Sequence, residues 1–210
     1  MRAENNSSFS IYTTNNLTID TTQNLSQQSI ILYLPSDNKY SNVYQQNFTW
    51  QTMPFATLYR FEVLDTLGQL LFSGSLNNNS TNYTFDAEGT YSWRVSGQND
   101  FSPSPFSTRK IFIDLTPPAQ PVLLLPLNND SVSLPVLLTW QNQIGVNLDS
   151  IFIYADTNLT QLVESNFTSF SQYEYSNGAL NQDYFWLVKS KDAAGNWGTV
   201  SGKRKFIIAE

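Results

Sequence analysis

Four short sequence patterns occur twice in this chain, in the same order both times. The offset between the two copies grows only from 90 residues (48 to 138) to 95 residues (109 to 204). An ordered set of matches at so steady an offset indicates an internal duplication, with a unit of about 90 residues. The matched pairs are Leu34-Pro35 with Leu125-Pro126, Phe48-Thr49-Trp50 with Leu138-Thr139-Trp140, Tyr91-Ser92-Trp93-Arg94-Val95 with Tyr184-Phe185-Trp186-Leu187-Val188, and Arg109-Lys110-Ile111 with Arg204-Lys205-Phe206.

Each copy reads as a series of β-strands. Apolar Tyr59, Phe61 and Val63 alternate with polar Arg60 and Glu62, which is the period of a strand with one buried face. Turn residues separate such runs, and no segment has a clear helical period. Only 13% of the residues are charged, so Asn, Ser, Thr and Gln must cover the outer faces. The sequence therefore predicts an all-β fold.

The stretch from Asp114 to Pro121 separates the copies and has three prolines in its last five residues. Proline fixes φ and favours an extended path, so we expect a short, stiff linker that restricts the relative orientation of the two domains. The predicted domains are residues 29–115 and 116–210. Residues 1–28 lie outside the repeat. We expect either a polar tether there, or two short strands at residues 8–12 and 17–20 docked on a sandwich.

Three further segments support a specific fold. Phe106-Ser107 stands before the last strand of the first copy, Thr116-Pro117-Pro118 opens the second copy, and residues 191–196 read Lys-Asp-Ala-Ala-Gly-Asn. With the Trp and Tyr-x-Trp strands, this order resembles bacterial fibronectin type III domains and exported bacterial Ig-like arrays of the Bacteroidetes type. The resemblance implies two tandem fibronectin type III-like β-sandwiches with a Pro-rich linker and a polar N-terminal extension. It also implies that Tyr91 and Tyr184 form tyrosine corners.

The residue inventory excludes most catalytic chemistry. The chain has no Cys and no His, so disulfides, thiolate or imidazole metal sites, thiol nucleophiles and His-dependent triads are impossible. A pair of carboxylates could still hydrolyse a glycoside, but the acids, such as Asp149 and Asp183, lie mostly at predicted turns. Two sandwiches filled by their own cores also leave no cleft for a sugar. We therefore predict no enzyme activity, no cofactor and no metal site.

Charge and hydropathy limit the partners. A net charge of −6 argues against nucleic acid, and the cluster Lys203-Arg204-Lys205 is most simply a solvated strand start. No apolar run is long enough for a transmembrane segment. The first residues lack the pattern of a signal peptide, so we expect either a cytoplasmic protein or a mature form whose export signal has been removed.

One loop of the second copy offers polar and aromatic side chains. Asp192 and Asn196 carry oxygens that calcium accepts, although such residues more often cap a tight turn. Trp197 has no counterpart in the first copy, and either binds a ligand or folds back over the end of the sandwich. Trp197, Tyr173 and Tyr175 are the side chains that we expect to stack on a glycan, should the protein bind one.

The two copies differ on one outer sheet face. Aligning Val63-Leu64-Asp65 with Tyr154-Ala155-Asp156 predicts charged or polar outward residues in the first domain and apolar ones in the second. Five such side chains would form a patch of the size that marks an interaction surface. The predicted patch consists of Ile151, Ile153, Phe185, Leu187 and Ile207.

Short Asp-Ser/Thr motifs bear on the compartment. They fit the O-glycosylation pattern of exported proteins in Bacteroidetes-type bacteria, and their acceptors are Thr21, Thr66, Ser131 and Ser150. With the domain type, they favour a periplasmic or surface-exposed protein, in the manner of an outer-membrane lipoprotein without its signal. The predicted function is a non-catalytic, protein-binding scaffold module of a cell-envelope or surface assembly. The alternative is a carbohydrate-binding accessory module.

Overall fold

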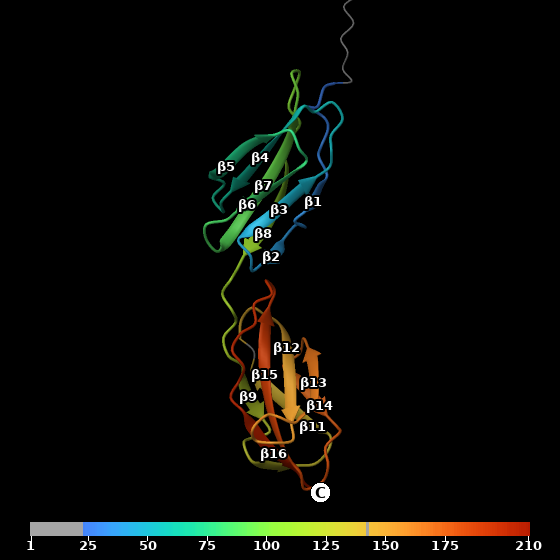
Figure 1. Ribbon diagram of the computed structural model, residues 1–210, viewed down its shortest axis with the longest axis vertical. Helices are drawn as coiled ribbons and strands as arrows, with labels where there is room; N and C mark the ends of the chain where they lie inside the picture. The colour runs from blue at the N-terminus through green and yellow to red at the C-terminus, as the bar shows by residue number, and fades with distance from the viewer. Residues whose placement is uncertain (1–22, 142) are drawn as a thin grey trace, which may run out of the picture.

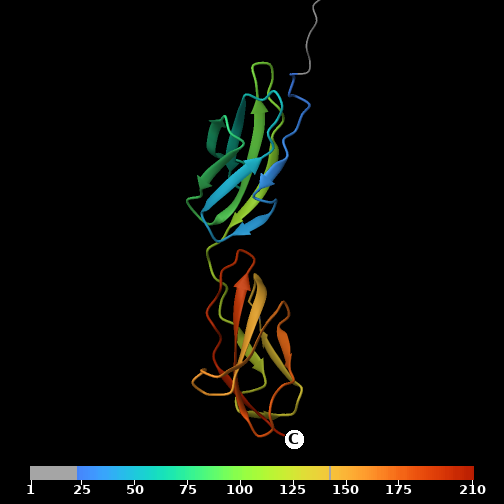
Figure 2. The ribbon, with the colours of Figure 1, turned by 45° about the vertical axis from the view of Figure 1, so that its right-hand side comes forward.

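The computed structural model describes residues 23–141 and 143–210, and within these ranges every regular element is a β-strand. The strands form two units that follow one another along the long axis of the molecule (Figure 1). Each unit pairs a three-stranded sheet with a five-stranded sheet. A second view shows the two layers of each unit with the linker between the units (Figure 2). The predicted pair of all-β sandwiches is confirmed.

The two units have the same topology. The three-stranded sheets have the orders β1-β3-β6 and β14-β11-β9, and the five-stranded sheets have the orders β2-β8-β7-β4-β5 and β10-β16-β15-β12-β13. Adding eight to each strand number of the first unit gives the second, which confirms the duplication. The strands of the first unit are β1 (Leu32–Leu34), β2 (Lys39–Ser41), β3 (Gln45–Trp50), β4 (Leu58–Leu64), β5 (Leu70–Leu76), β6 (Ser80–Thr84), β7 (Gly89–Gln98) and β8 (Ser107–Ile113). Those of the second are β9 (Val122–Leu125), β10 (Asp130–Val132), β11 (Val136–Gln141), β12 (Val146–Tyr154), β13 (Leu162–Thr168), β14 (Gln172–Tyr175), β15 (Asp183–Asp192) and β16 (Arg204–Ile208).

Aromatic side chains fill both cores. In the first unit Trp50 stacks on Phe61 with ring centroids 6.0 Å apart, and both side chains are fully buried. In the second unit Trp140 and Trp186 pack 6.5 Å apart and are also buried. Each large ring removes 150–250 Å² of surface from water, so these residues dominate the stabilisation of each sandwich.

An arginine makes equivalent hydrogen bonds to backbone carbonyls in both units. The Arg109 guanidinium donates to the carbonyls of Tyr33 and Pro35, at 3.0 and 2.8 Å. The Arg204 guanidinium donates to the carbonyls of Leu124 and Pro126, at 2.6 and 3.0 Å. These arginines therefore satisfy backbone acceptors of the preceding segment, which gives Arg204 a structural role within the basic cluster.

Both predicted tyrosine corners are present. The Tyr91 hydroxyl donates to the carbonyl of Ala87 at 2.9 Å. The Tyr184 hydroxyl accepts from the backbone N–H of Ala179 at 2.8 Å. In each case the ring ties its strand to the chain a few residues upstream, as such corners do in related sandwiches.

The described end of the N-terminal extension belongs to the first unit. Leu25 is fully buried in its core, and the Leu25 N–H donates to the Ser102 hydroxyl at 2.7 Å. The Asn99 side-chain amide donates to the carbonyl of Gln23 at 2.7 Å. The first domain therefore begins before residue 29. The two strands predicted at residues 8–12 and 17–20 lie outside the described residues.

The linker packs against a loop of the second unit. The Asn196 side-chain amide donates to the carbonyl of Asp114 at 2.7 Å. A Cβ added at Gly198 would lie 2.4 Å from the carbonyl oxygen of Pro118, well inside van der Waals contact. The absence of a side chain at Gly198 thus lets the linker lie directly on this loop.

Replacing Gly198 by alanine is expected to push the linker away from the second unit. The new methyl group must displace the Pro118 backbone, and overpacking of this kind costs about 1–3 kcal/mol. Small-angle scattering should show a broader distribution of overall dimensions, and urea unfolding a less stable second domain. Gly202→Ala is the matched control, because nothing lies within 4 Å of its added Cβ. Identical scattering and stability for Gly198→Ala and the unchanged protein would contradict the close approach.

Candidate functional site

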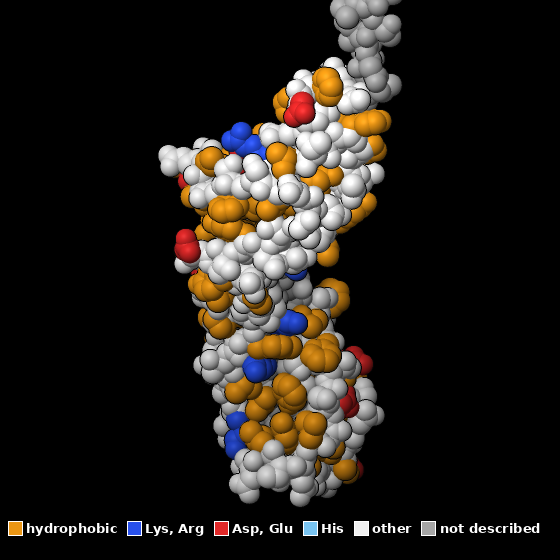
Figure 3. Space-filling view, turned by 45° about the horizontal axis from the view of Figure 1, so that its top comes forward, with side chains coloured by type: hydrophobic (Ala, Val, Ile, Leu, Met, Phe, Trp, Pro, Cys, Tyr) orange, Lys and Arg blue, Asp and Glu red, His pale blue; other side chains and the backbone are white. Residues whose placement is uncertain are grey.

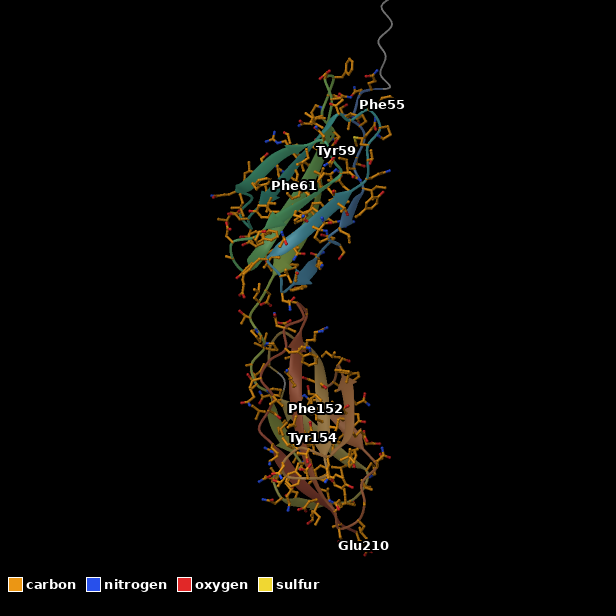
Figure 4. All side chains as sticks on the ribbon, in the orientation of Figure 1. Phe55, Tyr59, Phe61, Phe152, Tyr154 and Glu210 are labelled. Carbon is orange, nitrogen blue, oxygen red and sulfur yellow. The ribbon has the colours of Figure 1, made fainter. Side chains whose placement is uncertain are left out.

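Aromatic side chains cover the outer face of the five-stranded sheet in the second unit. Phe152 lies directly opposite Leu187, and Tyr154 directly opposite Phe185, so these four side chains share one face. Phe152 and Tyr154 come from β12, at the centre of the second unit (Figure 4). Phe152, Tyr154 and Phe185 are partly exposed, whereas Leu187 is 8% exposed. Ile207 on β16 is also partly exposed. We call Phe152, Tyr154, Phe185 and Leu187 the aromatic face.

The prediction that Ile151 and Ile153 point outward is wrong. Both are buried in the core, at 1% and 0% exposure, where they oppose Val188 and Trp186 across the sheet. Their neighbours Phe152 and Tyr154 take the outer positions instead. Phe185, Leu187 and Ile207 lie on the outer side, as predicted, although Leu187 is largely covered.

A difference in hairpin length explains this error. In the first unit the Asp65 N–H closes the β4–β5 hairpin by donating to the carbonyl of Gln69. In the second unit Ala155, not Asp156, makes the equivalent bond, and its acceptor is the carbonyl of Gln161. Asp156 therefore stands one residue further into a longer loop. Aligning the two aspartates shifts the strand by one residue and exchanges its faces.

Asp156 organises the longer loop. Its carboxylate accepts from the backbone N–H groups of Gln161, Thr160 and Asn158, at 2.6, 2.9 and 3.0 Å. These bonds, led by the one from Gln161, hold the pKa of Asp156 below its ordinary value. The sequence signal for the correct register was therefore the length of the loop. A capping aspartate marks a turn, but its distance from the preceding strand differs between loops, so two such aspartates need not be equivalent.

The same positions of the first unit carry an ion pair. Glu62 lies directly opposite Arg94, as Phe152 lies opposite Leu187. The Glu62 side chain is 2% exposed, and its carboxylate lies 2.7 Å from the Arg94 guanidinium and 2.6 Å from the Arg60 guanidinium. The first unit thus fills its outer face with paired charges, and the second fills the equivalent place with apolar side chains.

A hollow of 240 Å³ opens beside the aromatic face, toward β13. Phe152, Phe167 and Trp197 form its apolar walls, and Phe167 is 62% exposed. Figure 3 shows hydrophobic side chains gathered on this unit, with Lys and Arg side chains beside them. The full lining consists of Ser150, Phe152, Ser165, Asn166, Phe167, Lys189 and Trp197. A shallow hollow with ring-lined walls can receive one side chain or one sugar ring.

Trp197 lies on this outer face and not over the end of the sandwich. Its ring centroid is 6.4 Å from that of Phe167, and the ammonium groups of Lys189 and Lys191 lie 5.7 and 5.5 Å from it. A cation near the face of an indole is attracted by the ring quadrupole. The lysines therefore place positive charge directly beside the hollow.

With each Stern–Volmer slope divided by that of free N-acetyltryptophanamide, iodide is expected to quench the exposed tryptophan about twice as strongly as caesium at low ionic strength. Four of the five tryptophans are buried, so collisional quenching reports Trp197, and the two lysines concentrate the anion around it. Stern–Volmer slopes measure the difference. In a Lys189→Gln/Lys191→Gln variant the two slopes should approach one another. Equal slopes in the unchanged protein would show that the lysines do not set the local potential.

The loop before Trp197 is held by its own side chains. The Asp192 carboxylate accepts from the backbone N–H groups of Gly195 and Asn196, at 2.7 and 2.8 Å, and from the Asn196 side-chain amide at 2.8 Å. These bonds give Asp192 a turn-capping role in place of the calcium alternative. Across residues 23–141 and 143–210, no group of three or more acidic side chains is arranged to hold a metal ion. In the same residues no helix is long and apolar enough to cross a membrane.

Two of the three predicted glycan-stacking residues are not free to stack. Tyr175 is fully buried, and this burial raises the pKa of its hydroxyl. Tyr173 is partly buried against the core, and its hydroxyl donates to the Glu164 carboxylate, which raises the Tyr173 pKa. The prediction is therefore wrong for Tyr175, and of the three residues it is Trp197 that lines the hollow described above.

The predicted glycosylation acceptors differ in accessibility. Thr66 and Ser131 are exposed. Ser150 is 4% exposed within β12, so the folded protein does not present it to a transferase. Thr21 lies outside the described residues. Asp149, expected at a turn, lies instead within β12 and is fully buried.

Solved structures of fibronectin type III domains are similar to this chain. The crystal structure of the chicken CNTN1 FN1-FN3 domains matches with a TM-score of 0.56 at 16% sequence identity, covering 89% of this chain and 66% of that chain. The fibronectin(III)-like modules of Clostridium thermocellum CbhA match with a TM-score of 0.52 at 13% identity, covering 86% of this chain and 94% of that one. A scan against protein-family models and a search of curated protein sequences find no match.

These likenesses establish the fold. Both units have the fibronectin type III-like sandwich fold. A fold of this kind hosts many functions, so the role of this chain must be argued from its surface.

Proposed function

We propose that this protein is a non-catalytic, protein-binding scaffold module, and that it docks its partner through the aromatic face of the second domain. The observation that carries the proposal is the difference between two equivalent pairs of positions. The first domain has Glu62 opposite Arg94, and the second has Phe152 opposite Leu187. The core of a sandwich does not require apolar residues at these outer positions, because the first domain folds with charges there.

The energetics of protein interfaces also support a docking role for the aromatic face. Large aromatic side chains are enriched at the centres of protein interfaces, where they provide most of the binding energy. The aromatic face continues into the hollow walled by Phe167 and Trp197, so flat and concave apolar surface adjoin. The first domain, with its paired charges, then acts as a spacer.

An exported or surface location is part of the proposal. Two of the short Asp-Ser/Thr motifs have exposed acceptors, Thr66 and Ser131, which is the accessibility that O-glycosylation requires. Intact-mass measurement on protein purified from its native cells tests this part. An unmodified mass would remove the support that the motifs give.

Site-specific photocrosslinking tests the docking function. A photoreactive phenylalanine analogue at position 154 should give an adduct of discrete mass in native cells, because Tyr154 lies on the aromatic face. The same analogue at position 92, the outer face of the first domain, is the matched control.

The crosslinking experiment is then repeated in the double variant Phe152→Glu/Leu187→Arg. It rebuilds in the second domain the pair that the first domain already carries, so the domain should stay folded while the adduct disappears. An adduct that persists in the folded double variant, or one formed equally from position 92, would overturn the proposed docking face.

A further inference from the structure

Three cations beside the aromatic face have no ion-pair partner among residues 23–141 and 143–210. The ion pairs among the described residues join Arg60 and Arg94 to Glu62, and Lys205 to Asp183. Lys189 and Lys191 lie instead over the ring of Trp197, and the Lys203 ammonium lies 5.2 Å from the centroid of Phe185. Positive charge therefore surrounds apolar rings on this face without being neutralised by a carboxylate from the described chain.

This charge is concentrated locally in an acidic protein. Lys189, Lys191 and Lys203 lie over rings of this one face, whereas the whole chain has a net charge of −6. A second copy of the same face would bring like charges together, which costs binding energy. The surface is instead complementary to an acidic one.

The polar groups of the hollow do not suit a sugar. The Asn166 side-chain amide donates to the Tyr173 hydroxyl at 3.2 Å, and its oxygen accepts from the Phe167 N–H at 2.8 Å. Both ends of this amide are thus occupied. The hydroxyls of Ser150 and Ser165 and the ammonium of Lys189 remain, which are few for the several hydrogen bonds that fix a sugar's orientation. A volume of 240 Å³ is also below the roughly 300–1,000 Å³ of pockets that enclose a drug-sized ligand.

We propose that the second domain binds an acidic segment of its protein partner. One apolar side chain of that segment enters the hollow between Phe152, Phe167 and Trp197, and flanking Asp or Glu carboxylates pair with Lys189 and Lys191. The inference rests on the docking function proposed above and specifies the chemistry of the partner. It accounts for the apolar walls and for the unpaired lysines with one ligand.

Selection from a peptide library tests the inference. A phage library of random 12-residue peptides is panned against the full chain in 0.15 M NaCl. The expected consensus is an aromatic residue or leucine flanked by Asp or Glu. A synthetic peptide of that sequence should bind at least about tenfold more weakly to a Lys189→Glu/Lys191→Glu variant, and similarly weakly to the unchanged protein in 1 M NaCl, because salt screens exposed charge pairs.

Lys110→Glu in the first domain is the matched control, since Lys110 is exposed and distant in sequence from the site. Its affinity for the peptide should be unchanged. A neutral or basic consensus, or an acidic peptide insensitive to the lysine reversal, would overturn the inference.

A third arm separates this inference from the docking function. If the selected peptides lose binding in Phe152→Glu/Leu187→Arg but ignore the lysines, the docking face stands and the acidic partner does not. Selected peptides that bind the double variant unchanged would count against both. Binding to immobilised uronic-acid or neutral oligosaccharides, with no peptide selected, would assign the hollow to a glycan and overturn the inference.

Discussion

Replacing Asp149 by alanine is expected to destabilise the second domain by about 3 kcal/mol. Asp149 is fully buried, and its carboxylate accepts from the Trp140 indole N–H at 2.9 Å and from the Ser190 hydroxyl. The substitution leaves both buried donors without this acceptor, and each such loss costs about 1–3 kcal/mol. Urea unfolding followed by tryptophan fluorescence measures the change.

Two variants calibrate this result. Ser190→Ala removes one bond and should cost about 1 kcal/mol, and Asp149→Asn keeps an acceptor oxygen and should fall between the two. The first domain provides a reference within the chain. There the equivalent Trp50 indole N–H finds no hydrogen-bond partner among the residues that the structure describes, and the edge-on ring of Tyr59 lies 5.8 Å away. A loss below about 1 kcal/mol for Asp149→Ala would show that the second domain does not need this carboxylate. Trp140 would then resemble Trp50, which is buried without a hydrogen-bond acceptor among the described residues.

Arg94→Leu in the first domain is expected to cost about 3 kcal/mol, and adding Glu62→Phe should restore most of that loss. The single change removes one of two guanidinium groups from a carboxylate that is 2% exposed, and it also takes away the contact of Arg94 with the Phe106 ring at 4.3 Å. Breaking a buried pair costs about 3–5 kcal/mol, whereas replacing both partners by packed apolar groups is often neutral. The partial exposure of Arg94, at 35%, places the expected cost at the lower end.

A double-mutant cycle in urea measures this coupling. The four proteins are the unchanged chain, Arg94→Leu, Glu62→Phe and the double variant, and the interaction free energy follows from their unfolding free energies. Ser92→Ala, on the same face, is a control for general effects of substitution. A double variant no more stable than Arg94→Leu would mean that the two domains do not use interchangeable pairs on this face.

The sequence predicted the fold well because the same pattern of core residues occurs twice, so each copy supports the strand assignments made in the other. Trp50 with Trp140, and Trp93 with Trp186, fix the central strands of each core, and all four are buried. Arg109 of β8 and Arg204 of β16 make the same backbone contacts. Core positions are predictable because burial demands apolar side chains at a period of two.

The site was less predictable because surfaces depend on register and on turns. Asp65 and Asp156 both cap a hairpin, yet they stand at different distances from their strands, and this single offset exchanged Phe152 for Ile151. Tyr175 and Asp149 show the same limit. An aromatic residue or a carboxylate near a predicted turn can belong to a core strand when a partner such as Trp140 satisfies it.

Phe167 and Lys189 illustrate what only the folded chain can show. They lie on β13 and β15, which are separated by β12, and they border one hollow with Trp197 from a loop. No local pattern joins three residues so placed. Their association depends on the order of the strands in the sheet and on the position of the loop that carries Trp197. The repeat predicts the strand order but not the position of this loop.

One pairing common to both domains has a mechanical consequence. In each five-stranded sheet a short early strand pairs in parallel with the last strand: β2 with β8, and β10 with β16. A pull on the two ends of the chain draws the members of such a pair lengthwise in opposite directions, so their hydrogen bonds are loaded together in shear. Unfolding under an applied force is governed by the unfolding rate. A force that is enough to open a hairpin, whose hydrogen bonds break one at a time, should therefore unfold each of these domains only slowly. Single-molecule extension measures this, and two domains that yield at hairpin-like forces would contradict it. The outer faces of both domains would then stay folded while the chain is under tension.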